Sequence, residues 1–312
     1  MFTLYHADCI GQAGNCLYPH KVEITDTDSL ERAVSRDYVC AEYEGFYRSN
    51  DNFLGSDCLS VECDNDHSDN PADWKTPDDI ADAFPACPTY RAWTSKMIIA
   101  KLKKRDGLTI HTVKEALEQM LLDGITDVIV QPTHVINGIE NDQMKADALS
   151  FRDRFSSIVF GNPLLTTEED NQAIVRVVAD EFRDMDPDTA LVLMGHGTEH
   201  YANTVYAALD YRFKDTGHKN IFLGTVEAYP ALDSLLRAAD SFHPKKIMLA
   251  PFMIVAGDHA QNDLAGEDPD SWMNRLSSEG YEVTPVLKGL GEYPQVRQIL
   301  VEHVQQAMNA SV

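Results

Sequence analysis

The sequence predicts an α/β fold with parallel sheets flanked by helices, and two observations support this prediction. From about residue 89 onward, short apolar segments alternate with segments whose apolar residues recur at helical spacing. This alternation is typical of parallel strands joined by crossover helices. In addition, residues 127–141 and 246–260 share one pattern, in which an apolar strand leads through a proline to a glycine. We interpret the pattern as an internal duplication that makes two lobes, with chance similarity as the alternative.

Each strand is expected where four or five mostly apolar, often β-branched residues follow one another, and each helix where apolar residues are three or four apart. The expected strands span residues 90–93, 127–131, 157–160, 190–194, 221–224, 246–250 and 283–286. The expected helices lie near residues 95–105, 112–123, 141–154, 168–183, 200–212, 230–240, 270–279 and 294–308.

The composition argues against a protein that binds nucleic acids or membranes. The 312 residues include 50 acidic and 26 basic side chains, and the formal net charge is -24. Such a charge repels phosphate backbones and favours cationic partners such as divalent metals. No apolar run approaches the roughly 18 residues of a membrane span, and the start of the chain does not read as a secretory leader. We therefore expect a cytoplasmic protein, and the sequence also allows a homo-oligomer.

The first 87 residues differ in composition from the rest of the chain. All the cysteines lie there, namely Cys9, Cys16, Cys40, Cys58, Cys63 and Cys87. Because no two of them form a CxxC pair, we expect reduced thiols in preference to a structural zinc site. We predict an acidic N-terminal segment of foreign origin over residues 1–87, an incomplete first lobe over 88–160 and a second lobe over 161–312. The C-terminal helix is expected to pack back on the first lobe.

Two histidines stand out because each follows an apolar strand and a glycine. His196 has a glycine on both sides, and His259 ends the second copy of the duplicated pattern, after Asp258. Open α/β sheets bind ligands at the carboxyl ends of their strands, and neutral imidazole is a common ligand of divalent metals. We interpret both histidines as functional, with a buried structural histidine as the alternative for His196. We interpret Asp258 as a helix cap, with orientation of the His259 ring as its alternative.

Carboxylates near these histidines could complete a metal site. Glu227 ends the strand that lies between the two histidines in the sequence, and Glu140 occupies the position in the first lobe that His259 occupies in the second. Together with His134, Glu140 would form the matching patch of the first lobe. The alternative for either glutamate is an acid at a helix N-terminus, stabilised by the helix dipole. We expect His200 and His303 to be solvated.

Several long motifs resemble one known family. MGHGTEHYANTVYAALD, GTVEAYPALDSLL and APFMIVAGDHAQNDLAG are similar to segments of the sirohydrochlorin cobaltochelatases of anaerobic cobalamin biosynthesis, which are class II tetrapyrrole chelatases. RAWTSKMIIAKLKKRDGLTIHTVKEAL and QPTHVINGIEND extend the resemblance, so that it covers residues 88–312 approximately. A member of this family begins with a strand and a loop rich in Ser, Gly and Thr. This chain has no recognisable counterpart, so we expect its first lobe to lack the usual first strand, with Leu59–Cys63 as a substitute strand as the alternative.

The resemblance implies a function and a site. It implies two flavodoxin-like lobes that hold a tetrapyrrole between them, and an enzyme, a lyase, that inserts Co(II) into sirohydrochlorin. His196, Glu227 and His259 would bind the metal, while His196, His259 and Glu140 would act in catalysis. Cobalt is then a substrate, and no organic cofactor is expected. The alternatives are insertion of Fe(II) or Ni(II), and a protein that binds tetrapyrrole or metal without turnover.

A second resemblance concerns only the N-terminal segment. The stretch SVECDNDHSDNPADWKTPDDIADAFP, residues 60–85, is similar to the segment around the acidic metal motif of archaeo-eukaryotic primases. It implies that Asp64 and Asp66 would bind metal and that the chain is a chimera. The partner histidine motif and the third acid that a polymerase needs are missing downstream. We therefore expect a solvated acidic loop and no primase activity.

Overall fold

The computed structural model describes residues 2–8, 17–25, 29, 33, 38–39, 42–43, 53–55, 82–85, 87–96, 99–100, 103–104 and 109–310. The chain divides into two compact units, Met1–Glu62 and Cys63–Val312. Among the cysteines, Cys87 lies in the described part of the chain, where it is an exposed free thiol. The other five cysteines and the two acids of the primase-like motif, Asp64 and Asp66, lie outside the described residues.

The first unit contains short antiparallel strands. β1 (Phe2–His6) pairs with β2 (His20–Ile24) and with β3 (Tyr38–Val39), and β4 (Glu42–Tyr43) pairs with β5 (Phe53–Gly55). Leu4 and Ile24 are buried against each other across the first of these pairs, together with Ala33.

The second unit contains both lobes, and the first lobe is built on a small parallel sheet. β6 (Asp127–Val130) pairs in parallel with β7 (Ser157–Phe160). The flanking helices are α4 (Val113–Leu122), α5 (Ile139–Leu149) and the short 3-10 helix η4 (Arg152–Arg154). Val128 and Met144 belong to the buried cluster that joins β6 to α5.

The prediction of a strand at residues 90–93 is wrong. Trp93 forms only an isolated bridge to Thr112, and its backbone N–H donates to the carbonyl of His111 at 2.9 Å. Only part of this stretch is apolar, so burial does not favour an extended strand there. Of the helix expected near 95–105, the structure describes residues 95–96, 99–100 and 103–104, and all of these except Ser95 are helical.

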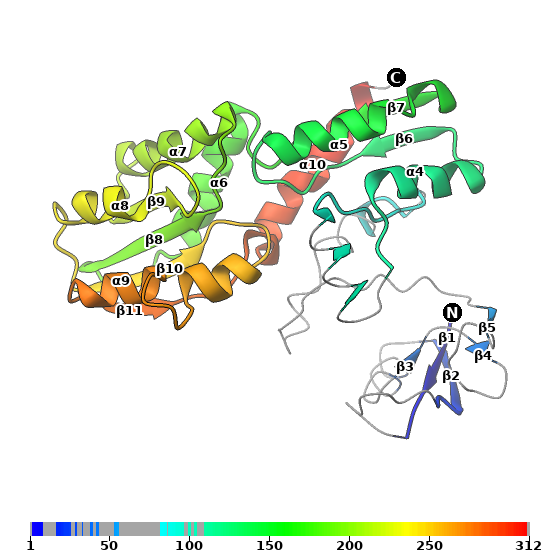
Figure 1. Ribbon diagram of the computed structural model, residues 1–312, viewed down its shortest axis with the longest axis horizontal. Helices are drawn as coiled ribbons and strands as arrows, with labels where there is room; N and C mark the ends of the chain where they lie inside the picture. Colours follow the sequence, from blue (N-terminus) through cyan, green and yellow to red (C-terminus); the bar gives the residue numbers. More distant parts are fainter. Residues whose placement is uncertain are drawn as a thin grey trace. The chain divides into compact units, whose positions relative to one another are not determined.

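The second lobe is a four-stranded parallel sheet covered on both faces. Its strands are β8 (Thr189–Gly195), β9 (Ile221–Thr225), β10 (Lys246–Pro251) and β11 (Glu282–Pro285), in the order β11-β10-β8-β9. All neighbouring strands are parallel, as Figure 1 also shows. The lobe's helices are α6 (Glu168–Glu181), the 3-10 helix η5 (Tyr201–Asn203), α7 (Thr204–Asp215), α8 (Leu232–Ala239), the π-helix η6 (Ala260–Leu264) and α9 (Trp272–Ser278). The predicted strands and helices of this lobe are confirmed within a few residues.

Alternation along β8 distributes its side chains between two cores. Leu191 and Leu193 join the cluster formed with α6 and α7, while Val192 and Met194 join the cluster formed with α8 and α9. Every residue of β8 is buried, because both faces of a parallel sheet are covered by crossover helices. β8 is therefore the fixed centre from which the neighbouring loops are positioned.

The last helix, α10 (Pro294–Ala310), contacts elements of both lobes. It follows the 3-10 helix η7 (Leu290–Glu292), and it contacts α6 as well as β6 and β7 (Figure 1). Contrary to expectation, His303 on this helix is buried, with 2% of its surface exposed. Its Nδ1 lies 3.0 Å from the Asn162 carbonyl oxygen, and its Nε2 lies 2.9 Å from the Asp170 carboxylate. These two acceptors take the place of the water that we expected around the His303 ring.

Among the residues that the structure describes, no helix is both long enough and apolar enough to span a membrane.

Candidate metal centre

Three loops that follow parallel strands bring polar side chains to one end of the second sheet. From the central β8, the chain passes first to β9 on one side and then to β10 on the other, and ligands bind at such a reversal of strand order. His196 directly follows β8, Glu227 lies two residues after β9, and His259 lies in the loop after β10. The topology therefore gathers three side chains that are distant in the sequence.

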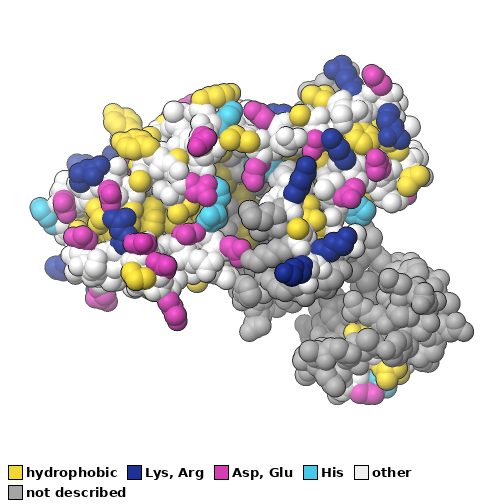
Figure 2. Space-filling view, viewed as in Figure 1, with side chains coloured by type: hydrophobic (Ala, Val, Ile, Leu, Met, Phe, Trp, Pro, Cys, Tyr) yellow, Lys and Arg dark blue, Asp and Glu magenta, His cyan; other side chains and the backbone are white. Residues whose placement is uncertain are grey.

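The ligand atoms of these three residues lie close enough to share one metal ion. One atom from each of His196, Glu227 and His259 lies within 4.8 Å of the others. The imidazole rings of His196 and His259 meet edge to face, with their centroids 4.5 Å apart, and Glu227 Oε2 is 3.6 Å from His196 Nδ1. We call these residues the ligand trio. Figure 2 shows histidine and acidic side chains beside one another on the exposed surface of this lobe.

In both histidines of the trio, Nδ1 forms a hydrogen bond, which leaves Nε2 available to bind a metal. His196 Nδ1 lies 2.8 Å from the Gly197 carbonyl oxygen, and His259 Nδ1 lies 2.6 Å from Asp263 Oδ2. Both oxygens can only accept, so each Nδ1 carries the proton. In a neutral ring this leaves the Nε2 lone pair free to bind a metal.

Close packing holds the His196 loop in place. A Cβ on Gly195 would lie 2.6 Å from the ring of the buried Tyr206, and Gly197 adopts a φ of 89°. The Glu227 backbone N–H donates to the His196 carbonyl at 2.9 Å, which connects the loops after β8 and β9. Burial raises the pKa of Tyr206 to about 12, although a hydrogen bond with the Gly197 backbone opposes this rise. Tyr206 therefore stays uncharged and packs against the loop.

The N-terminus of α5 in the first lobe lies beside the same loop. His200 Nε2 is 3.4 Å from Asp142 on α5, and a Cβ on Gly138 would lie 3.9 Å from the Thr198 methyl group. The His200 side chain is only 14% exposed, so the expectation that it is solvated is wrong. Its Nδ1 accepts from the Ala202 backbone N–H, which leaves Nε2 to face the carboxylate.

Glu140 is exposed near the start of α5, and it does not belong to the ligand trio. Its negative charge acts on His134, whose Nε2 lies 3.3 Å from the Thr94 hydroxyl. Burial lowers the pKa of His134, and the nearby Glu140 only partly opposes that change. The structure thus places Glu140 and His134 together in the first lobe, as a patch separate from the three ligand atoms.

Comparison with known proteins identifies the family. The family model described as "Cobalt chelatase (CbiK)" matches residues 68–309, which is more than half of the chain. The chain belongs to the CbiK cobalt chelatase family. The match begins earlier than the expected residue 88, inside the stretch that resembles primases.

Individual relatives agree with this membership. The chelatase is 37% identical over 234 residues to the sirohydrochlorin cobaltochelatase of Salmonella typhimurium, a match that covers 75% of this chain and 88% of that protein. It is 33% identical over 238 residues to sirohydrochlorin cobaltochelatase CbiKC of Nitratidesulfovibrio vulgaris, with 74% and 82% covered.

A solved structure supports the fold. The cobalt complex of the sirohydrochlorin chelatase SirB from Bacillus subtilis subspecies spizizenii matches with a TM-score of 0.50 and 12% identity, over 78% of this chain and 93% of that one. At this identity the likeness concerns the fold alone.

Sequence reasoning missed one contact of the candidate metal centre. The Asp263 carboxylate is bonded to the His259 ring, and His259 is itself the N-cap of η6 and forms no capping bond with its side chain. The four-residue spacing between His259 and Asp263 was a usable signal, because residues i and i+4 share one face of a helix.

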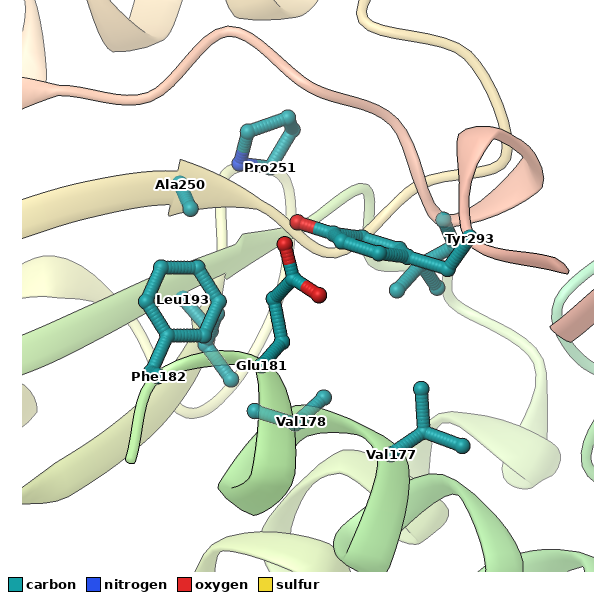
Figure 3. A pocket seen from close by; sticks show the side chains of 9 residues that line it. Val177, Val178, Glu181, Phe182, Leu193, Ala250, Pro251 and Tyr293 are labelled. Atoms are coloured by element: carbon teal, nitrogen blue, oxygen red, sulfur yellow. The ribbon is translucent and has the colours of Figure 1, made fainter. Parts of the chain in front are cut away.

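A pocket elsewhere in the chelatase does not belong to this site. Figure 3 shows it between α6, the ends of β8 and β10, and Tyr293. It is lined mainly by apolar side chains, and the Glu181 carboxylate points towards the Tyr293 hydroxyl. Burial, and then the charges of Glu181 and Glu292, raise the pKa of Tyr293. No member of the ligand trio lines this pocket, so it is a packing gap of the core.

Proposed function

We propose that the chain inserts Co(II) into sirohydrochlorin, and that the ligand trio holds the metal before transfer. The observation that carries this proposal is the convergence of His196, Glu227 and His259 within 4.8 Å. Two imidazoles and one carboxylate are ligands that late first-row divalent metals accept. Cobalt is here a substrate that enters and leaves, so its site must bind it without trapping it.

The composition and exposure of the trio suit such temporary binding. The side chains of His196 and Glu227 are 48% and 53% exposed, so both metal and macrocycle can reach them. The trio contains no thiolate, a soft ligand that would hold the ion more tightly. Three protein ligands also leave coordination positions open for the nitrogens of an incoming substrate.

Exposed apolar side chains next to the trio offer a surface for a flat macrocycle. Tyr201, Tyr229 and Val255 are each more than half exposed, and they lie in the loops that carry the second-lobe site residues. Ile139, also exposed, precedes Glu140 at the start of α5. Large exposed apolar side chains that gather at one site mark a binding surface, and the face of a tetrapyrrole would cover them.

The reaction exchanges one metal for two protons. Co(II) forms bonds to the macrocycle nitrogens, and two pyrrole N–H bonds break, so two protons must leave the product. When the metal departs, the Nε2 lone pairs of His196 and His259 become available to accept a proton. Glu140 is proposed as the second acceptor, because it is an exposed carboxylate on the helix that contacts the His196–His200 loop.

A rate assay tests the proposal. Purified full-length chain is incubated without oxygen with sirohydrochlorin and Co(II), and the change in tetrapyrrole absorption is compared with the uncatalysed rate. We expect a clear excess rate, which His259→Ala reduces to background. His111→Ala is the matched control, since His111 is exposed and lies outside the trio.

Two results would contradict the proposal. If His259→Ala keeps the excess rate, the metal assignment is wrong. If the unaltered chain binds sirohydrochlorin tightly but gives no excess rate, it is a carrier and not an enzyme. Parallel assays with Fe(II) and Ni(II) identify the preferred metal, for which we expect Co(II).

A further inference from the structure

The two histidines of the ligand trio are supported in different ways. Behind His196, the acceptor for Nδ1 is a backbone carbonyl, that of Gly197. Behind His259, the acceptor is the Asp263 carboxylate, 2.6 Å from Nδ1. We propose that Asp263 is a positioning residue, which keeps the His259 ring oriented with Nε2 towards the substrate metal. This inference rests on the proposed function, because it assumes that the trio binds the metal.

The local fold makes Asp263 a fixed partner of the ring. His259 is the N-cap of η6, and Asp263 lies four residues later on that helix. Ala260 and Leu264, the residues that anchor η6 in the protein, are both fully buried. Leu264 packs in the cluster that contains residues of β8 and β10, the strands that position the two histidines. The carboxylate is thus held relative to the same core as the site.

Stability alone does not account for this hydrogen bond. The side chains of His259 and Asp263 are 35% and 45% exposed. A pair with this exposure contributes little to the stability of the fold. Its effect on metal binding is larger, since loss of the partner of a ligand histidine typically weakens metal affinity by about 10–100-fold.

The tautomers of the His259 ring explain why the pair affects metal binding more than stability. A carboxylate accepts a hydrogen bond only from a protonated nitrogen, so Asp263 favours the tautomer with the proton on Nδ1. In the other tautomer the proton is on Nε2, and that nitrogen cannot bind a metal. Asp263 also resists rotation of the ring. The carbonyl of Gly197 does the same for His196, but as a backbone group it cannot be removed by substitution.

Titration with Co(II) alone tests the role of Asp263. The full-length chain and its variants are titrated, and the visible d–d absorption of bound Co(II) reports affinity and ligand geometry. We expect Asp263→Ala to weaken Co(II) binding by about 10–100-fold and to change the absorption bands. Asp263→Glu should restore part of the affinity, and the isosteric Asp263→Asn should fall between the alanine variant and the original.

Asp142→Asn is the matched control. Asp142 also has its carboxylate near a histidine, His200 at 3.4 Å, but that histidine is not in the trio. We expect its substitution to leave Co(II) affinity and the absorption bands unchanged. A comparable loss in this variant would show that any His–Asp pair has the same effect, which would overturn the assignment.

The remaining outcomes separate this inference from the proposed function. If the unaltered chain shows no bands of bound Co(II), the trio is not a metal site and the proposed function fails. If the unaltered chain binds Co(II) and the Asp263 variants bind it equally well, only the positioning role fails. Lower melting temperature with unchanged affinity would likewise overturn it, as a purely structural contact. If Asp263→Ala does not fold, the Co(II) affinity of Asp263→Asn tests the positioning role in its place.

Discussion

At the scale of residues, the metal binding proposed for the trio depends on single side chains. Glu227 supplies the only carboxylate among the three ligands, and its side chain is half exposed. The charge of this side chain attracts a divalent ion, whereas its packing contributes little to the fold. Changes in Glu227 should therefore affect the metal and spare the protein.

We expect Glu227→Gln to weaken Co(II) binding about tenfold, which corresponds to about 1.4 kcal/mol. The amide keeps an oxygen donor but loses the negative charge. Isothermal titration calorimetry measures the change, and the melting temperature should stay the same. Glu199→Gln, at an exposed position in the neighbouring loop, is the control and should bind Co(II) normally. Equal affinities for Glu227→Gln and the unaltered chain would remove Glu227 from the site.

Gly195, the residue before His196, has to be a glycine because the ring of Tyr206 lies close to its Cα. A Cβ at Gly195 would lie 2.6 Å from the Tyr206 ring, and Tyr206 is buried and cannot move aside freely. We expect Gly195→Ala to lower the free energy of unfolding by about 1–3 kcal/mol through overpacking. Urea unfolding measures this loss.

Gly257 offers the matched control for that substitution. A Cβ there meets no atom within 4 Å, and its φ is not in the left-handed region. Gly257→Ala should therefore leave stability nearly unchanged, although it lies two residues before His259. A Gly195→Ala variant as stable as Gly257→Ala would contradict the steric argument.

At the scale of elements, a buried contact between His303 and Asp170 joins α10 to the start of α6. Thr167 caps α6 and forms a capping box with Asp170, whose other carboxylate oxygen faces His303 on α10. Both ring nitrogens of His303 lie within hydrogen-bond distance of acceptors. Asp170 therefore takes part in the cap of α6 and also contacts α10.

This pair should make stability depend on pH in the acid range. Burial by itself raises the pKa of Asp170, but hydrogen bonds from His303 and from the Thr167 and Thr166 backbones outweigh it, so the net pKa lies below the ordinary value. A carboxyl group with a lowered folded-state pKa stabilises the fold above its unfolded pKa of about 3.9. That stabilisation is lost as the pH falls through the folded-state value.

We expect His303→Leu to lower the free energy of unfolding by about 3 kcal/mol at pH 7, because it leaves the Asp170 carboxylate buried without its partner. The difference from the unaltered chain should shrink as the pH falls through the lowered folded-state pKa of Asp170, where the carboxylate becomes protonated. Urea unfolding at several pH values measures both effects. A difference that does not change with pH would mean that the substitution acts through packing alone.

At the scale of the whole chelatase unit, the lobes contact each other at several places, among them the following two. α10 contacts β6 and β7, and His200 of the second lobe faces Asp142 of the first. The second contact joins the loop that carries His196 to the helix that carries Glu140. We therefore expect it to affect how the proposed proton acceptor lies relative to the trio.

We expect Asp142→Asn to lower kcat/KM for sirohydrochlorin about fivefold. A partly exposed pair contributes about 1 kcal/mol, and that energy corresponds to about fivefold in rate. Steady-state assays at saturating Co(II) measure this effect, while the affinity for Co(II) should not change. An unaltered kcat/KM would show that the contact between the lobes does not affect turnover.

Local sequence patterns were sufficient for most elements and for the candidate ligands. Burial of β8 and its neighbours follows from their apolar runs, and each ligand of the trio lies just after a strand, where parallel topology brings loops together. The expectations failed where a side chain depends on a distant partner. His303 was expected in water because its acceptors, Asn162 and Asp170, lie far from it in the sequence.

The sequence by itself thus determined the α/β class, the order of strands and helices in the second lobe, the family, and the residue types able to bind a metal. These properties depend on neighbours along the chain, which set hydrophobic periodicity and turn geometry. Only the tertiary structure decided that three ligand atoms lie within 4.8 Å, that Asp263 is bonded to the His259 ring, and that His200 faces Asp142. Those contacts arise from packing between elements, and no local pattern specifies the distance between side chains on separate loops.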